Sequence, residues 1–207
     1  MGFIGIESYD LIIYLAMTMQ ALNCSVLLID NSHELSLAEC IPGLPEATNA
    51  SPVDYRGITT VKGLNELPDN YDYVLVYFGK DIAQGLENVN EVYMVTDYQK
   101  HNVNFLRSVE LTEDNYPFLV VRDRVASKVT PESIHLELEE LSIPSESVLT
   151  IEDSSYDLNL KVMCQYNSLS GLAKVSDSIK EFIRVALSED YSEAEIRAAF
   201  KIVTRRK

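Results

Sequence analysis

The chain has 207 residues and a formal net charge of -15, because 32 Asp and Glu residues outnumber 17 Lys and Arg residues. With 46% hydrophobic and 24% charged residues, the composition is that of a globular protein and excludes general disorder, a collagen-like repeat and a coiled-coil rod. The negative charge repels phosphate backbones, which argues against broad nucleic-acid binding. The three cysteines form no CxxC pair, so we expect a reduced, cytoplasmic protein without a disulfide framework or a zinc site.

Short apolar runs alternate with helical patterns along most of the chain. Strands are predicted over residues 3–6, 26–29, 55–61, 73–78, 92–96, 118–121 and 148–151. Helices are predicted over residues 8–22, 34–40, 81–87, 99–109 and 131–141. The strand runs lack polar alternation, which is typical of strands covered on both faces and joined by parallel crossovers. The predicted fold is α/β, with a doubly wound, mostly parallel sheet and helices on both of its faces.

Two amphipathic helices are predicted at the C-terminal end. The first covers residues 170–187, and the second begins at Ser192, which forms a capping box with Glu195. We expect residues 1–187 to form one domain and residues 188–207 to form a basic amphipathic helix that packs on it or extends from it. The side chains that this helix offers to a partner or a membrane are Ile196, Phe200, Lys201, Val203, Arg205 and Arg206.

A ligand of such a sheet is expected beyond the carboxyl ends of the strands. A phosphate site there needs a Gly-rich turn and a helix N-terminus, usually with a lysine. The first turn has a single glycine, Gly5, together with Glu7 and Asp10, and it has no lysine. No Lys or Arg precedes Arg56, whereas seven acidic residues do. A polyphosphate would meet uncompensated negative charge, so ordinary nucleoside triphosphate binding is not expected.

Five segments follow one another in a familiar order. VLLID at 26–30, YDYVLVYFG at 71–79 and NEVYMVTDYQKHNVNFLRSV at 90–109 are followed by FLVVRDRV at 118–125 and VLTIEDSSYDLNLKVMCQYNSL at 148–169. Over residues 2–187 the chain resembles the ParA/MinD-like (deviant Walker A, SIMIBI-class) P-loop ATPases. The second segment is similar to that family's "YDYVLIDTPP" strand and the fourth to its "VVLNRV" strand. The resemblance extends to the divergent members that place pili, flagella and secretion systems, and it implies a P-loop NTPase-like fold.

The resemblance also implies that the chemistry of the family's first motif is missing. Counting back from Asp30, the position of the phosphate-binding lysine falls on Ser8 and that of the magnesium-binding residue on Tyr9. The Walker B aspartate position falls on Tyr77, so only Asp30 is retained among the catalytic groups. Without the lysine and the metal ligands, nothing stabilises the charge that develops in phosphoryl transfer.

The position of the adenine-contacting asparagine falls on Asp123, beside a retained Arg124. By this resemblance we expect a pseudo-ATPase without cofactor or metal, which acts by binding a protein partner. The partner would be an active ATPase relative, a component of a cell-envelope machine or a second copy of the chain, and not a nucleic acid. A second hypothesis is a regulatory domain that binds another nucleotide or a small metabolite in the remnant site.

The sequence alone leaves two interpretations open for several residues. Asp30 either binds a ligand or caps a turn, and Tyr9 and Tyr77 either fill the vacated pocket or line a smaller one. The acidic block at 129–160 is either a solvated face or a docking surface for a basic partner. The C-terminal helix packs on the domain, docks a partner or touches a membrane weakly, which would place a cytoplasmic protein at the inner face of that membrane.

Overall fold

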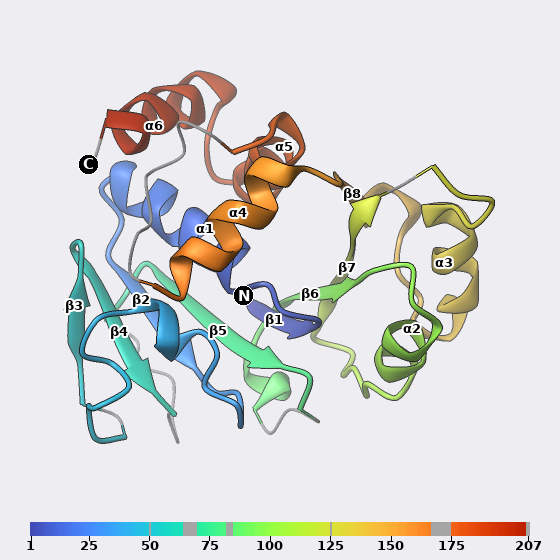
Figure 1. Ribbon diagram of the computed structural model, residues 1–207, viewed down its shortest axis with the longest axis horizontal. Helices are drawn as coiled ribbons and strands as arrows, with labels where there is room; N and C mark the ends of the chain where they lie inside the picture. The colour runs from blue at the N-terminus through green and yellow to red at the C-terminus, as the bar shows by residue number, and fades with distance from the viewer. Residues whose placement is uncertain (50, 64–69, 82–84, 125, 167–174, 206–207) are drawn as a thin grey trace.

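The computed structural model describes residues 1–49, 51–63, 70–81, 85–124, 126–166 and 175–205 (Figure 1). Its centre is one sheet with the strand order β3-β4-β2-β5-β1-β6-β7-β8. Neighbouring strands pair in parallel, except for the antiparallel pair β3 and β4 at one edge. The strands are β1 (Gly2–Gly5), β2 (Val26–Asp30), β3 (Val53–Tyr55), β4 (Ile58–Lys62), β5 (Tyr73–Gly79), β6 (Glu91–Thr96), β7 (Tyr116–Arg124) and β8 (Val148–Glu152).

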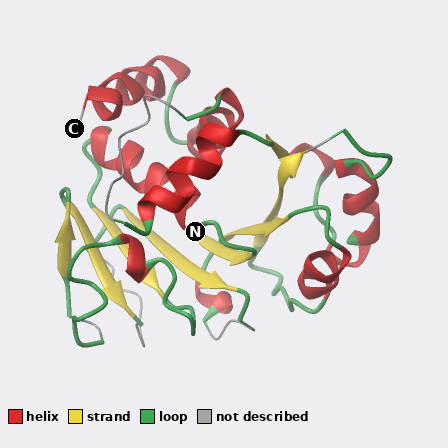
Figure 2. Ribbon diagram, viewed as in Figure 1, coloured by secondary structure: helices red, strands yellow, loops and turns green. Residues whose placement is uncertain are grey.

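Helices cover both faces of this sheet, which confirms the predicted α/β, doubly wound fold (Figure 2). The helices are α1 (Tyr9–Ala21), α2 (Lys100–Arg107), α3 (Pro131–Glu137), α4 (Ser155–Cys164), α5 (Asp177–Leu187) and α6 (Glu193–Arg205). Side chains of α1, α4, α5 and α6 join the core on one face, and those of α2 and α3 join the core on the other. This two-sided cover explains why the strands read as continuous apolar runs.

The first core surrounds α1, whose residues are all buried except Gln20. The sheet lies on one side of this helix, and α4, α5 and α6 pack against its other sides. An aromatic stack continues the core across the sheet, because Tyr93 lies between Phe3 and Phe118 with ring centroids 4.9 and 4.7 Å apart. A helix that is apolar all round requires such complete cover.

The predicted strand over 55–61 is two strands joined by a tight turn. Tyr55 pairs with Ile58, so Arg56 and Gly57 form a two-residue hairpin loop. Both loop residues have positive φ, 59° at Arg56 and 84° at Gly57, as the primed turns of β-hairpins require. The prediction of one strand is wrong because an arginine in the left-handed region gives little sequence signal.

Two helix predictions also differ from the structure, and one helix was not predicted. Residues 34–40 contain only a short 3₁₀ turn at Ala38–Cys40, and the helix predicted over 131–141 ends at Glu137 before a second 3₁₀ turn at Glu139–Leu141. Helix α4 was not predicted, although Ser154 caps it by accepting a hydrogen bond from the backbone N–H of Asp157. Part of the helix predicted over 81–87 and the start of that over 170–187 lie outside the described residues.

The apolar stripe of α6 is buried inside the fold. Ile196, Phe200 and Val203 are at most 9% exposed, and α6 packs against α1 and α5. The prediction that these three side chains contact a partner or a membrane is therefore corrected, since they complete the cover of α1. Lys201 and Arg205 are exposed, and Arg206 lies outside the described residues. Within the described ranges, no helix has both the length and the apolar character needed to cross a bilayer.

Candidate functional site

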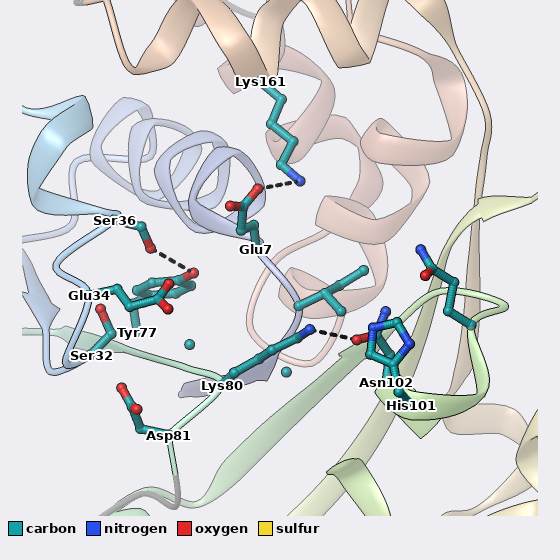
Figure 3. Close-up of a pocket in the computed structure, with 14 residues that line it drawn as sticks. Glu7, Ser32, Glu34, Ser36, Tyr77, Lys80, Asp81, His101, Asn102 and Lys161 are labelled. Atoms are coloured by element: carbon teal, nitrogen blue, oxygen red, sulfur yellow. Dashed lines mark hydrogen bonds and ion pairs between the residues drawn. The ribbon is translucent and has the colours of Figure 1, made fainter. Parts of the chain in front are cut away.

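A cavity of about 400 Å³ opens beyond the carboxyl ends of β1, β2, β5 and β6 (Figure 3). This is the place where an open parallel sheet binds ligands. The turns after these strands form most of its wall, and helices α2 and α4 supply the rest. The lining residues are Gly5, Ile6, Glu7, Ser32, Glu34, Ser36, Tyr77, Gly79, Lys80, Asp81, Gln99, His101, Asn102 and Lys161.

The turn from β1 to α1 is short, because only residues 6–8 separate Gly5 from Tyr9. Gly5 has a φ of 121°, and a Cβ atom at this position would lie 1.9 Å from the carbonyl oxygen of Val95. The chain can pass β6 this closely only with glycine here. Three residues do not supply the longer Gly-rich loop whose backbone N–H groups cradle a phosphate.

Two tyrosine side chains fill the space around the start of α1. Tyr9 and Tyr77 are 2% and 1% exposed. The Tyr77 hydroxyl oxygen accepts a hydrogen bond from the Ser36 hydroxyl at 3.1 Å, and the Ser8 backbone N–H also bonds to it. Burial raises the pKa of both phenols, so both side chains are neutral. Ser8 is fully buried, and its Oγ atom has no hydrogen-bond partner among the described residues.

Asp30 holds the loop that follows β2. Its carboxylate accepts hydrogen bonds from Ser32 N at 3.0 Å, from Ser32 Oγ at 2.6 Å and from Ala38 N at 2.7 Å. Burial raises the pKa of this fully buried carboxyl, and the hydrogen bonds from Ser32 and Ala38 oppose that shift. Asp30 does not line the cavity, so in this structure its geometry is that of a residue that closes a turn.

A buried ion pair supports the first turn from behind. The Arg122 guanidinium on β7 donates to both carboxylate oxygens of Asp10 on α1, at 2.7 and 2.8 Å. The same guanidinium donates to the Glu7 carbonyl oxygen at 3.1 Å, which fixes the path of the turn. Both charged side chains are at most 3% exposed. Sequence reasoning missed this pair, although an arginine inside the apolar run FLVV-R-D-R was a signal for it.

Basic side chains reach the cavity from distant parts of the chain. Lys80 donates to Asn102 Oδ1 at 2.6 Å, and the Asn102 amide in turn donates to Asp97 Oδ1 at 2.7 Å. Lys161 on α4 pairs with Glu7 at 3.1 Å. The predicted uncompensated negative charge at this place is therefore wrong, because the fold brings these lysines to it.

The cavity has an uneven distribution of charge. Glu34 and Asp81 lie on one side, and Asn102 and His101 lie on the opposite side (Figure 3). Within the part of the chain that the structure describes, Lys80 takes part in no ion pair, so its ammonium charge is not neutralised. A ligand that carries charges of both signs would find a complementary group at each end of this cavity.

Asp123 and Arg124 lie apart from this cavity. Asp123 is exposed and has a φ of 56°, and Arg124 pairs with Glu152 on β8 at 3.0 Å. Arg124 lines a second cavity of about 390 Å³ with Tyr98. Of the six remnant nucleotide-site positions, Tyr77 lines the main cavity, while Ser8, Tyr9 and Asp30 lie buried outside its lining. The described residues contain no group of His, Cys, Asp and Glu side chains that could hold a metal ion.

No protein-family model and no curated protein matches the sequence of this chain. Solved structures match its fold over almost its full length. The MinC:MinD cell division protein complex of Aquifex aeolicus has a TM-score of 0.60 at 14% identity, and covers 100% of this chain and 97% of that chain. A ParA family ATPase from Chlorobium tepidum has a TM-score of 0.57 at 14% identity, and the match covers 90% of this chain and 97% of that chain.

A putative plasmid partition protein of Borrelia burgdorferi, bound to AMPPNP, has a TM-score of 0.55 at 16% identity, and the match covers 97% of this chain and 98% of that chain. At such low identity these similarities concern the fold alone. The chain has the fold of the ParA/MinD ATPases.

Proposed function

We propose that this protein is a pseudo-ATPase of the ParA/MinD fold that acts by binding another protein. The observation that carries the proposal is the packing of Tyr9 and Tyr77 around the start of α1. The resemblance to the ParA/MinD-like ATPases assigns the phosphate-binding loop and the Walker B aspartate of that family to this place. A phosphate would have to displace two buried aromatic side chains to reach the helix N-terminus.

The residues at the expected catalytic positions support the absence of hydrolysis. Ser8 cannot supply the positive charge of a lysine, and Tyr77 cannot bind magnesium as an aspartate does. Asp30 is retained, but its oxygens already accept three hydrogen bonds that hold the following loop. None of the three residues at these positions, Ser8, Asp30 and Tyr77, is free to stabilise a developing negative charge on a phosphoryl group.

A protein partner fits the chain better than a nucleic acid does. One of the similar structures is a MinC:MinD complex, and another, at a TM-score of 0.50, is pNOB8 ParA bound to nonspecific DNA. The net charge of -15 disfavours DNA binding by this chain. We therefore propose an adaptor or a spatial and assembly factor for a cell-envelope machine such as a pilus or a secretion system. It would act in the cytoplasm or at the inner face of the membrane, alone or as a dimer.

Titration calorimetry of the purified protein with ATP and ADP, with and without magnesium, tests this proposal. We expect no binding heat at millimolar nucleotide and no release of phosphate. Micromolar ATP binding would overturn the proposal, as would ATP hydrolysis that disappears in Asp30→Ala and persists in the control variant Asp114→Ala. Asp114 is the suitable control because it is an exposed aspartate outside the cavity and outside the remnant nucleotide-site positions.

The cavity itself favours a second candidate function, the binding of a small metabolite. His101 and Asn102 face the acidic pair Glu34 and Asp81 across about 400 Å³, and the Lys80 ammonium reaches toward the side of Asn102, to which it donates a hydrogen bond. An amino acid or a similar small zwitterion would match these two sides. A thermal-shift screen of amino acids should then give a stabilisation that Lys80→Met abolishes and Lys100→Met, at an exposed lysine of α2, leaves unchanged. If no compound stabilises the wild-type protein, this second function is excluded for the compounds screened.

A further inference from the structure

Exposed apolar side chains gather on α4 and just after it. Tyr156, Leu158, Val162 and Tyr166 are 67%, 59%, 45% and 72% exposed. Among the described residues, half of the large hydrophobic side chains with this degree of exposure lie in this one segment. We refer to these four side chains as the α4 surface. Contiguous apolar exposure of this kind marks an interaction site in a folded protein.

The α4 surface does not belong to the core-facing side of its helix. Leu160 and Cys164 are buried in the first core, where α4 packs against α1. Leu158, Val162 and Tyr166 follow one another at steps of four residues, so the first two lie on a different side of the helix from the buried pair. A surface helix normally turns a polar face outward, and this helix turns a second apolar face outward.

Two acidic residues lie at the N-terminal end of the α4 surface. Glu152 and Asp153 are exposed and directly precede the helix cap, and Glu152 also pairs with Arg124 at 3.0 Å. Lys161 is the single basic residue of α4, and Glu7 neutralises it. A second copy of the chain would bring its own charge of -15 to this place, and an anionic membrane would also be repelled. Charge complementarity therefore favours a partner segment that is both apolar and basic.

We propose that the α4 surface binds an amphipathic helix of a partner protein, with Lys or Arg residues beside its apolar face. This inference rests on the proposed adaptor function and specifies the chemistry of the partner. The apolar stripe of the partner packs on Leu158 and Val162, and a basic residue at its end meets Asp153. Helix-on-helix recognition of this type uses anchors three and four residues apart.

A synthetic peptide tests the proposal on the full chain. The probe is a fluorescent Leu/Lys amphipathic helix of about five turns, and its counterpart has Glu in place of each Lys. We expect fluorescence anisotropy to show binding of the Lys peptide alone. Leu158→Ser/Val162→Ser should weaken this binding by at least about tenfold. Leu136→Ser, at a leucine on α3 that is 68% exposed, is the control and should leave the affinity unchanged.

Three outcomes would overturn the proposal. The first is the same affinity in the wild-type protein, in Leu158→Ser/Val162→Ser and in Leu136→Ser, because binding would then follow net charge alone, which neither variant changes. The second is no difference between the Lys and the Glu peptide. The third is a fall in the light-scattering mass of Leu158→Ser/Val162→Ser from dimer to monomer, which would make the surface an interface between two copies. Nucleotide titration is a separate experiment, so ATP binding with an intact peptide response would overturn the pseudo-ATPase proposal and leave the α4 surface standing.

Discussion

At the scale of single residues, the ion pair of Arg122 and Asp10 connects β7 to the first turn. Both groups are buried, so removal of one partner leaves an uncompensated charge in the core. We expect Arg122→Met to lower the free energy of unfolding by about 3–5 kcal/mol, measured by urea denaturation. The double variant Arg122→Met/Asp10→Leu should recover most of this loss, since it removes both charges together.

Arg124→Met is the matched control for this prediction. The Arg124 side chain pairs with Glu152, but both side chains are more than half exposed. Such a surface pair contributes less than about 1 kcal/mol, so the control should unfold almost as the wild-type protein does. Equal stability of Arg122→Met and Arg124→Met would show that the buried pair does not hold the turn.

Gly5 gives a second prediction at this scale. Its positive φ and the close carbonyl of Val95 leave no room for a side chain. We expect Gly5→Ala to cost more than about 4 kcal/mol, seen as a lower urea midpoint or as loss of soluble protein. Gly43→Ala is the comparison, because Gly43 has a φ of 81° with no atom within 4 Å of the added Cβ. That variant should lose only about 1–2 kcal/mol from backbone strain.

At the scale of elements, the packing of α6 can be tested directly. Phe200 is 9% exposed, whereas Ile202 on the same helix is 45% exposed. We expect Phe200→Ala to lower the free energy of unfolding by about 3 kcal/mol and Ile202→Ala to change it by no more than about 0.5 kcal/mol. Circular dichroism during urea unfolding measures both values. An unchanged stability of Phe200→Ala would indicate that α6 does not depend on this contact and can separate from α1.

The elements also show where the sequence was informative. Strands covered on both faces have continuous apolar runs, and the sequence predicted the ends of these strands to within a few residues. Helix α4 was missed because Tyr156, Leu158, Leu160 and Val162 alternate with polar residues. This period of two is typical of a strand, and it arises here because both the inner and the outer face of the helix carry apolar side chains. The feature that concealed the helix is the same one that forms the α4 surface.

The candidate site was predictable only in part. The carboxyl edge of the sheet and the two tyrosines followed from strand order and from the resemblance. The charge of the cavity did not, since Lys80, His101 and Lys161 come from the turn after β5, from α2 and from α4, and meet only in the folded chain. Local counts of acidic residues before Arg56 therefore gave the wrong electrostatic picture. Only tertiary structure assembles charges over such distances in sequence.

At the scale of the whole molecule, the charge of -15 predicts self-repulsion in the folded state. Salt screens this repulsion, so the free energy of unfolding should rise on the order of 1 kcal/mol between dilute buffer and high NaCl. Urea midpoints at several NaCl concentrations measure the change. Glu139→Lys/Glu140→Lys, at two exposed positions of a 3₁₀ turn, should raise the low-salt midpoint and flatten the salt dependence. A midpoint that falls with added salt would contradict the prediction.

The short turn between β1 and α1 has a consequence for how this molecule can change. Substitution alone cannot turn it into a phosphate cradle, because a lysine at position 8 would be buried at the start of α1, beside Tyr77. The backbone would first have to become longer, and two aromatic side chains would have to leave the core. Point mutations replace residues without adding them, so a phosphate cradle at this turn requires an insertion. Under the proposed function, substitutions at single positions therefore change what the site binds without making the protein an ATPase.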